Sequence, residues 1–405
     1  MERLIGIAGI LVLLSIALAM SNNRKAISWQ LVTWGLGIQL LFAIIILKTP
    51  IGVPFFGAID IGIKYLLSFS DAGSDFLFKS FRHGVVEDPL MNFAFRILPT
   101  LIFFSSLIAV FYHLGIMQLI VKWIARIMQK SMGTSGSETL CVSGNIFVGQ
   151  TEAPLLVRPF ISKMTKSELM AVMVGGFATV AGGVMAMYVS ILGDIPGIAG
   201  HLLAASIMSA PAALVIAKII YPETEASETF GNLKIALDKK DDNIMEALSR
   251  GATNGMKLAA NVAAMLVAFV AIIAMVNAIL GLMDLSLQQI LGWIFSPLAW
   301  VMGVPWNEAG IIGSLMGEKL VLTELIAYGD LAELMATNSI SDRSAIIASY
   351  ALCGFANFAS VGIQLGGIGG IAPERRKDLA KLGLKAMFGG ALASWLTATI
   401  AGLLI

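Results

Sequence analysis

Long apolar segments constrain the fold of this chain more than any other feature of its sequence. A helix needs about 20 residues to cross the hydrocarbon core of a bilayer. Eight apolar runs approach or exceed that length: 4–20, 27–47, 97–112, 169–192, 202–220, 258–280, 345–371 and 382–405. Only 13% of the 405 residues are charged, whereas about a quarter are charged in a typical soluble domain. The sequence therefore predicts an all-α polytopic membrane protein with about eight transmembrane helices.

The remaining composition argues against several classes of partner and site. The formal net charge is only +1, so a nucleic-acid partner is not expected. His83, His113 and His201 are isolated in the sequence, and it contains neither an HExxH motif nor a phosphate-binding P-loop. A metalloenzyme and an ATP-driven pump are therefore disfavoured. Cys141 and Cys353 fit small packing residues better than a redox pair.

The distribution of basic residues predicts how the chain is oriented. Lys and Arg are concentrated in alternate loops, and the gap at 193–200 has neither. Basic loops face the cytoplasm, so both termini are expected on the outer side, which is the periplasm if the membrane is a bacterial inner membrane. The first apolar run is interpreted as a retained helix, because SNNRKA (21–26) follows it in place of a small-residue cleavage site.

Two segments lie outside this simple scheme. Residues 51–78 mix apolar and polar positions, and Lys64, Lys79 and Arg82 place basic charge near them on the side predicted to be outside. We expect an amphipathic helix on the membrane surface there. The longest polar segment, 221–250, is predicted to be a cytoplasmic linker; its basic residues are Lys234, Lys239, Lys240 and Arg250.

The two halves of the chain repeat one order of motifs. Thr151-Glu152 is followed by Gly-Phe-Ala at 176–178, and Thr323-Glu324 is followed by Gly-Phe-Ala at 354–356. Each half also contains an apolar span, an amphipathic helix (116–132 or 287–302), a broken polar stretch and two further spans. The charge pattern puts the starts of the two broken stretches on opposite sides of the membrane. This order indicates an inverted-topology repeat, in which interrupted segments mark the substrate site of a secondary transporter.

The two broken stretches, 137–163 and 307–334, are predicted to be re-entrant helical hairpins, called hairpin 1 and hairpin 2 below. Gly144, Gly149, Pro154 and Pro159 interrupt the first one. Non-helical backbone at membrane depth is tolerated only when it is buried in protein or lines a wet cavity. Its free carbonyl groups can then bind a hard cation such as Na⁺, while nearby side chains bind a polar solute.

Glu152 and Glu324 are the strongest candidates for a functional site. A carboxylate within the bilayer is costly and normally faces a cavity where it has a function. The alternative is a structural pair with a buried arginine, for example Arg158 or Arg96.

Three further positions carry weaker expectations. Asn357 and Ser360 are expected on one helical face beside Phe355, with hydrogen bonding between helices as the alternative. Trp306, Asn307 and Glu308 are expected to cap the start of hairpin 2, because Asn is a favoured N-cap and a carboxylate suits a first turn.

These motifs resemble one known family. GNIFVGQTEAPLLVRPF (144–160), GGFATVAGGV (175–184), GVPWNEA (303–309) and ALCGFANFASVGIQLGG (351–367) closely resemble the concentrative nucleoside transporters, particularly the bacterial members. The resemblance covers nearly the whole chain. It implies a homotrimer whose subunits each have a scaffold and a moving, elevator-like transport domain that carries both hairpins. The chain then divides into N-terminal scaffold helices (1–96), a first repeat (97–220), the linker (221–250) and a second repeat (251–405).

The resemblance also assigns site residues. It implies nucleobase contacts at Gln150, Thr151 and Glu152, with Val184 and Leu258 packing nearby. It implies ribose contacts at Glu324, Asn357 and Ser360, with Phe355 beside the sugar. A co-transported sodium ion would be bound by the backbone carbonyls of Asn145, Val148 and Val180 and by the Thr179 hydroxyl, at a break in span four. Threonine replaces the serine that is usual at this hydroxyl position, and it retains the oxygen ligand.

The expected function is therefore sodium-driven import of nucleosides such as uridine. Proton coupling through Glu152 or Glu324 is the main alternative, followed by transport of another small polar solute. A channel or an intramembrane enzyme belongs to a different class and is disfavoured. The sequence leaves open the preference between pyrimidines and purines.

Overall fold

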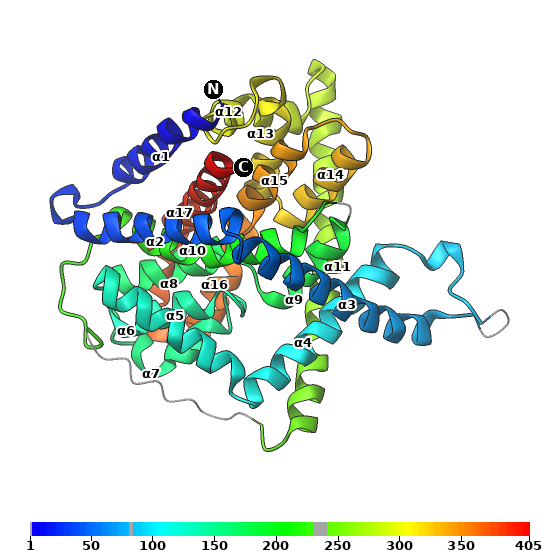
Figure 1. The fold of residues 1–405 in the computed structure, drawn as a ribbon, viewed down its shortest axis with the longest axis horizontal. Coiled ribbons are helices and arrows are strands. Elements are labelled where there is room, and N and C mark those ends of the chain that lie inside the picture. Colours follow the sequence, from blue (N-terminus) through cyan, green and yellow to red (C-terminus); the bar gives the residue numbers. More distant parts are fainter. Residues whose placement is uncertain (1, 81–83, 194, 231–240) are drawn as a thin grey trace.

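The computed structural model describes residues 2–80, 84–193, 195–230 and 241–405, and the regular elements of this part are helices apart from one β-bridge between Ser135 and Phe230. The all-α prediction is confirmed (Figure 1). The α-helices are α1 (Glu2–Ala19), α2 (Trp29–Lys48), α3 (Gly52–Phe78), α4 (Leu98–His113), α5 (Ile116–Met132), α6 (Gly136–Gly144), α7 (Arg158–Ile161), α8 (Lys166–Ala178), α9 (Gly182–Ile191), α10 (Ile198–Ile220), α11 (Ile244–Leu280), α12 (Leu287–Val301), α13 (Trp306–Val321), α14 (Glu324–Ala336), α15 (Asp342–Leu352), α16 (Phe358–Ile371) and α17 (Arg376–Leu404).

Several of these helices are long and apolar enough to cross a membrane. In the described part they are Trp29–Lys48, Gly52–Phe78, Phe93–His113, Lys166–Ile191, Ile198–Ile220, Ile244–Met283 and Pro373–Leu404, and the pair α12–α13, bent by 118°, could add one more. Helix α1 is a shorter apolar helix. Helix α3 forms where an amphipathic helix was expected, and its length and composition also suit a span, so its position on the membrane surface stays a prediction.

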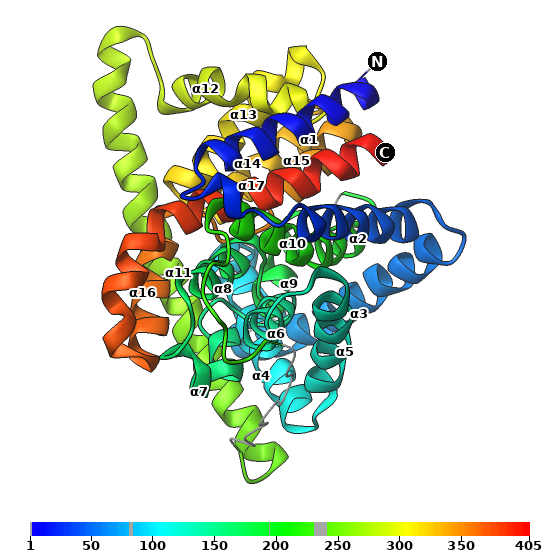
Figure 2. The same ribbon diagram turned by 90° about the vertical axis from the view of Figure 1, so that its left-hand side faces the viewer.

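The predicted repeat is present in the order of elements. The first half runs α4, α5, hairpin 1 (α6 to α7), the interrupted span α8–α9, and α10. The second half runs α11, α12, hairpin 2 (α13 and α14), the interrupted span α15–α16, and α17. Helices α8 and α10 are almost wholly buried and α17 is buried along its second half, whereas most of α11 is exposed. Figure 2 accordingly shows α11 along one side of the molecule.

Some predicted boundaries differ from the structure. The run 345–371, expected to be one span, is divided because α15 ends at Leu352 and α16 begins at Phe358. Helix α11 begins at Ile244 and so includes the last part of the predicted linker. Some residues used in these predictions lie outside the described part of the chain. They are Arg82, His83, Lys234, Lys239 and Lys240.

The breaks in the two interrupted spans pack directly against each other. Gly354, in the break between α15 and α16, has φ +128°. A Cβ atom at this position would lie 2.6 Å from the carbonyl oxygen of Phe177 and 2.9 Å from the carbonyl carbon of Ala178, at the end of α8. Gly390 of α17 approaches the same point, since its Cβ would lie 2.3 Å from the Cβ of Phe177. The repeated Gly-Phe-Ala motifs therefore meet at a backbone contact that only glycine allows.

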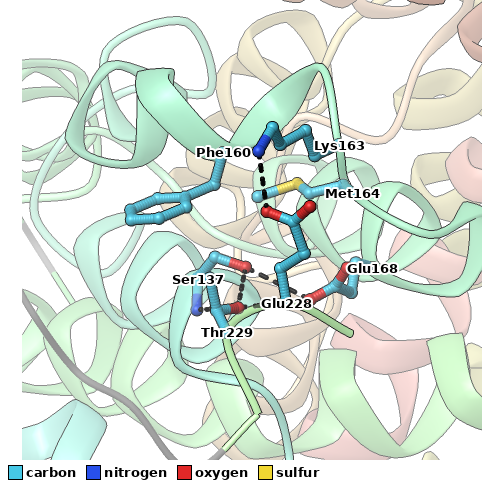
Figure 3. A pocket seen from close by; sticks show the side chains of 7 residues that line it. All are labelled: Ser137, Phe160, Lys163, Met164, Glu168, Glu228 and Thr229. Carbon is cyan, nitrogen blue, oxygen red and sulfur yellow. Dashed lines mark hydrogen bonds and ion pairs between the residues drawn. The ribbon is translucent and has the colours of Figure 1, made fainter. Parts of the chain in front are cut away.

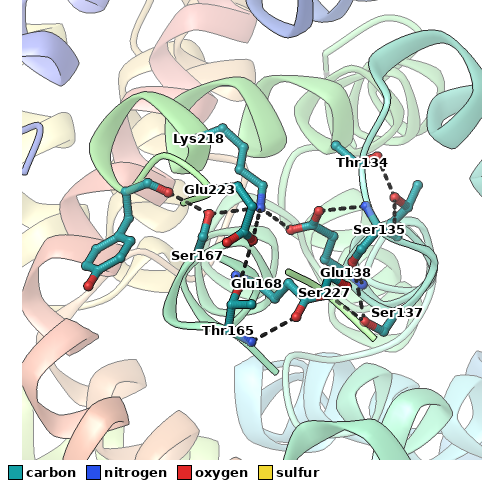
Figure 4. A network of polar contacts seen from close by, with 12 residues as sticks. Thr134, Ser135, Ser137, Glu138, Thr165, Ser167, Glu168, Lys218, Glu223 and Ser227 are labelled. Carbon is teal, nitrogen blue, oxygen red and sulfur yellow. Dashed lines mark hydrogen bonds and ion pairs between the residues drawn. The ribbon is translucent and has the colours of Figure 1, made fainter. Parts of the chain in front are cut away.

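A polar cluster joins the segment after α10 to the first turns of α6 and α8 (Figure 4). The Lys218 ammonium, near the end of α10, forms an ion pair with Glu138 of α6 at 2.7 Å. It also donates to the hydroxyl of Ser167 in α8 at 2.9 Å and pairs with Glu223 at 3.4 Å. The side chains of Lys218 and Glu138 are only 6% and 2% exposed. A buried charge is tolerated when it is paired and hydrogen-bonded in this way.

Helix caps complete this cluster (Figure 4). Figure 3 shows Glu168 at its edge, with its carboxylate facing the hydroxyls of Ser137 and Thr229. Glu138 and Glu168 each close a capping box, with Ser135 and Thr165 as the respective N-cap residues. Glu168 Oε1 also accepts from the hydroxyl of Ser227 at 2.6 Å, in the segment after α10. The start of hairpin 1, the start of α8 and the end of α10 are therefore held together through side chains of both signs.

We expect Gly354→Ala to destabilise the protein strongly. The new methyl group would collide with the end of α8, and alanine does not tolerate this positive φ, which together cost more than about 1 kcal/mol. The melting temperature in detergent measures the effect. Gly366→Ala on α16 is the control, because a Cβ there meets nothing within 4 Å. Equal melting temperatures for Gly354→Ala and the unsubstituted protein would contradict the proposed close contact.

We expect Lys218→Met to lower stability by about 3–5 kcal/mol, because it leaves the buried Glu138 carboxylate without a counter-charge. Lys163→Met is the matched control. Lys163 pairs with Glu228 at 3.2 Å, but their side chains are 62% and 55% exposed, so its loss should change stability by less than about 1 kcal/mol. Denaturation in detergent at constant protein concentration compares the two. Similar losses in both variants would be inconsistent with this interpretation.

Candidate functional site

The tip of hairpin 1 is the non-helical stretch between Gly144 and Ala153. Gln150 in this tip is buried, and its Oε1 accepts a hydrogen bond from Nε2 of Gln364 at 3.0 Å. Gln364, on α16, also donates to the carbonyl of Met173 at 3.1 Å. Both glutamines pack over Gly176 of α8, where a Cβ would lie 2.6 Å from Gln364 Nε2. The tip of hairpin 1 is thus attached to the interrupted span of the other repeat.

Thr151 and Glu152 complete the tip. Thr151 packs on Gly367 of α16, where a Cβ would lie 2.7 Å from its Cγ2. Glu152 is exposed, and its carboxylate lies over Gly149, where a Cβ would come within 2.2 Å of Oε2. Within the described residues, no hydrogen bond or ion pair joins Glu152 to an arginine. Its carboxylate can accept hydrogen bonds from a solute.

Glu324, the first residue of α14, is 5% exposed and is held by donors from two other elements. Its Oε1 accepts from the hydroxyl of Tyr188 on α9 at 2.7 Å. Its Oε2 accepts from Nδ2 of Asn357 at 2.8 Å. An ionised carboxylate has about four acceptor positions, so these two donors leave capacity for further hydroxyl groups. Of the two arginines considered as alternative partners, Arg96 pairs instead with Asp75 and Asp71.

Asn357 is placed differently from our expectation. It is the N-cap of α16, and its Oδ1 accepts from the backbone N–H of Ser360 at 2.8 Å. The two residues therefore lie at a helix start and not along one face of a continuous helix. The reason is the break that precedes α16. Capping fixes the amide so that its nitrogen points at Glu324.

The start of hairpin 2 also differs in part from the prediction that Trp306, Asn307 and Glu308 cap it. Pro305 occupies the N-cap position of α13 and makes no side-chain cap, so Asn307 is not the cap. Glu308 does lie in the first turn, as expected. Its Oε2 accepts from the hydroxyl of Ser341 at 2.9 Å, which ties α13 to the start of α15.

Two backbone breaks supply the oxygens predicted to bind sodium. Residues 145–148 follow α6, and Thr179 and Val180 follow α8. The two segments are joined by a hydrogen bond from the N–H of Gly182 to the carbonyl of Phe147 at 2.9 Å. The carbonyls of Asn145, Val148 and Val180 accept no hydrogen bond within the described part of the chain.

Two side chains near these breaks are also notable. The hydroxyl of Thr179 donates to the carbonyl of Gly175 at 2.9 Å, so its oxygen lone pairs remain available. The side-chain amide of Asn145 is buried, and neither of its polar atoms has a partner among the described residues. Buried polar groups are normally hydrogen-bonded. Such a set of oxygens suits a hard cation.

The other predicted residues have less defined positions. Val184 is buried on α9, one turn before Tyr188, and Ser360 is buried in the first turn of α16. Phe355 is half-buried in the break before Asn357. Leu258 is half-buried on α11 and packs against the hydrophobic core.

Sequence reasoning missed two polar residues of the site, Tyr188 and Gln364. Both lie in apolar spans, where a polar side chain is unusual and is often functional. Gln364 lies within ALCGFANFASVGIQLGG (351–367), but the resemblance implies no role for it. Tyr188 stands alone in MAMYVSI, which resembles ordinary core sequence.

Comparison with known proteins identifies the family. Residues 8–81 and 201–402 match the models described as the N-terminus and C-terminus of the Na⁺ dependent nucleoside transporters, and residues 94–195 match the model described as nucleoside recognition. This chain belongs to the Na⁺ dependent nucleoside transporter family. It is therefore a helical membrane transporter of a family that uses sodium as the co-transported ion, and not an enzyme, as predicted.

Individual relatives agree with this assignment. An uncharacterized transporter of Haemophilus influenzae is 45% identical, and the alignment covers 100% of this chain and 98% of that protein. The sodium/nucleoside cotransporter 1 of Rattus norvegicus is 42% identical over 100% of this chain but only 64% of its own length. The chain therefore spans somewhat less than two thirds of this mammalian relative.

Solved structures give the same result. CNTnw in an inward-facing substrate-bound state has a TM-score of 0.92 and 44% identity, covering 100% of this chain and 98% of that one. A variant of CNTnw in an outward-facing state has a TM-score of 0.91 and 43% identity, with the same coverage.

Proposed function

We propose that this protein imports nucleosides, uridine among them, across a bacterial inner membrane by symport with sodium. The observation that carries this proposal is the buried Glu324 carboxylate, held by a tyrosine of the first repeat and an asparagine of the second. A neutral nucleoside needs hydrogen bonds and not a counter-charge, and ribose hydroxyls are donors to such a carboxylate. A site built this way rejects analogues that leave its buried groups unpaired.

The nucleoside lies between the two hairpins in this proposal. Gln150, Thr151 and Glu152 bind the base, with Val184 and Leu258 against it. Glu324, Asn357 and Ser360 bind the ribose, with Phe355 beside the sugar. The hydrogen bond between Gln364 and Gln150 supports this arrangement, because it couples the base side to α16, whose first turn carries Ser360.

Sodium binds next to the base side, at the carbonyls of Asn145, Val148 and Val180 and the hydroxyl of Thr179. The support is that these carbonyls accept no hydrogen bond within the described residues. The tip of hairpin 1 and the break in span four are also joined through Phe147 and Gly182. Inward movement of one positive charge supplies about 2.3 kcal/mol per 100 mV of membrane potential. Proton coupling through Glu152 or Glu324 is the alternative, and uptake driven by pH without sodium would identify it.

Transport follows by an elevator-like movement of the hairpins with the interrupted spans. The support is the set of direct contacts among them: Gln150 with Gln364, Tyr188 with Glu324, and Gly354 with Phe177. Elements so closely joined move as a unit more readily than they separate. We further propose a homotrimer, with lipid around the exposed helices and both termini in the periplasm.

The proposed function predicts sodium-driven uptake of radiolabelled uridine into proteoliposomes. An inward sodium gradient should concentrate unmodified uridine above its external level, which a channel or an enzyme cannot do. Glu324→Gln should lower uridine affinity about ten- to hundredfold, because a hydrogen bond to a charged group contributes about 1.5–3 kcal/mol.

Glu308→Gln provides the matched control, since Glu308 accepts hydrogen bonds from Ser341 at the far end of hairpin 2. It should transport uridine like the unsubstituted protein. Uptake that is independent of both sodium and proton gradients would refute symport. Unchanged uridine affinity in Glu324→Gln would remove this residue from the proposed site.

We expect Thr179→Val to raise the sodium concentration needed for half-maximal uptake severalfold, because it removes one oxygen ligand while preserving side-chain volume. Thr399→Val on α17 is the control. Its hydroxyl makes the same type of bond, to the carbonyl four residues earlier, at 2.7 Å, but it lies outside the proposed ion site. Identical sodium dependence in Thr179→Val and the unsubstituted protein would exclude the Thr179 hydroxyl as a ligand.

A further inference from the structure

Lys319 is a fully buried lysine near the end of α13, in the first arm of hairpin 2. Its side chain is 0% exposed. Its ammonium donates to the carbonyl oxygen of Ala351 at 2.8 Å. Among the described residues it forms no ion pair with a carboxylate. Lysine is almost never fully buried without a partner, because removing its charge from water is costly.

Two features compensate for this buried charge. Ala351 lies in the last turn of α15, where carbonyls lack partners within the helix and the helix dipole is negative. The second feature is the negative charge of the Glu324 carboxylate, which is buried across the tip of hairpin 2 from Lys319 and attracts the ammonium. Both charged groups are buried, so water screens this interaction little.

The attachment of hairpin 2 to α15 does not by itself require a charge. Tyr328, on the second arm of hairpin 2, donates to the carbonyl of Ser349 at 2.8 Å, also near the end of α15. A neutral hydroxyl thus makes the same kind of bond as Lys319 without the cost of a buried charge. The two hydrogen-bond donors of Glu324, Tyr188 and Asn357, are neutral as well. The positive charge of Lys319 therefore has a use besides anchoring the hairpin.

We propose that Lys319 is a positioning residue of the ribose site, whose charge stabilises the negative charge of Glu324 while its hydrogen bond holds hairpin 2 against the end of α15. This inference rests on the proposed function, in which Glu324 accepts the ribose hydroxyls. A carboxylate that keeps its charge accepts hydroxyl hydrogen bonds more strongly than a neutral carboxyl group. Lys319 acts through Glu324 and does not touch the nucleoside.

Binding of two ligands tests the proposal. Uridine and 2′,3′-dideoxyuridine differ only in the 2′- and 3′-hydroxyls of the ribose. The dissociation constant of 2′,3′-dideoxyuridine divided by that of uridine therefore measures recognition of these hydroxyls. Lys319→Gln retains a donor and removes the charge, whereas Lys319→Met removes both. Both variants should lower the ratio about fivefold or more, because hydrogen bonds to charged groups are stronger than neutral ones. Isothermal titration in detergent with saturating sodium gives both constants.

Two controls separate this role from a structural one. Tyr328→Phe removes the neutral anchor on the same helix end, so it should lower the melting temperature while leaving the ratio unchanged. The double variant Lys319→Met with Glu324→Gln should bind uridine no more weakly than Glu324→Gln alone, because the two charges act as a pair. If Lys319→Met does not fold, Lys319→Gln carries the test.

A ratio in Lys319→Gln equal to that of the unsubstituted protein would overturn the proposal, since the donor alone would then suffice. Additive losses in the double variant would overturn it too. The unsubstituted protein distinguishes failure of this inference from failure of the proposed function. Absence of sodium-dependent uridine binding there would refute the function, whereas normal binding with an unchanged ratio in Lys319→Gln would refute only the role of Lys319.

Discussion

The close approach of two broken spans is the constraint on which the rest of this structure depends. Gly354 meets the carbonyl of Phe177 at a distance that excludes any side chain, and Gly390 of α17 packs on the same residue. Because both spans stop being helical at this crossing, their backbone groups and helix ends become available at the centre of the protein. A continuous helix would satisfy those groups internally and would leave nothing to bind an ion or to orient Asn357. The glycine contact therefore permits the polar chemistry next to it.

The buried charged side chains around the crossing have hydrogen-bond or ion-pair partners. Glu324 is buried with neutral donors on both oxygens, and Lys319 lies buried on the other arm of the same hairpin. At the start of hairpin 1, Lys218 and Glu138 form a buried ion pair that fastens this hairpin to α10. In a low-dielectric interior an uncompensated charge would be more costly than any single hydrogen bond could offset. Each hairpin thus makes one buried lysine contact with a neighbouring helix. In hairpin 2, Lys319 itself donates to α15, and in hairpin 1, Glu138 pairs with Lys218 of α10.

Much of this arrangement could be predicted from the sequence, because some signals are local. The spans follow from runs of apolar residues, and the hairpins follow from glycines and prolines beside Thr-Glu pairs. The break in span seven (345–371) was not predicted, because ALCGFANFASVG contains no proline and only one glycine in its first half. The positive φ of that glycine, Gly354, is visible only in the fold. The contact between Tyr188 and Glu324 joins residues 136 positions apart. No pattern in one sequence reveals such a pair, and a single tyrosine among apolar residues resembles ordinary core. The prediction that Asn357 lies along one face of a helix was wrong because the break before α16 was not foreseen. An N-cap can be recognised only where a helix is known to begin.

The order of these contacts also explains how one movement could couple two solutes. The proposed ion ligands lie in the tip of hairpin 1 and in the break of span four, and a backbone hydrogen bond from Gly182 to Phe147 joins them. Gln150 in the same tip is bonded to Gln364 of span seven, and span seven carries Asn357 at its break. A cation that orders the tip of hairpin 1 would therefore also fix one wall of the proposed nucleoside site, with no need for a distant pathway. Coupling of this kind is a difference in affinity between two states of one element, and it acts reciprocally, so a bound nucleoside favours the ion as much as the ion favours the nucleoside.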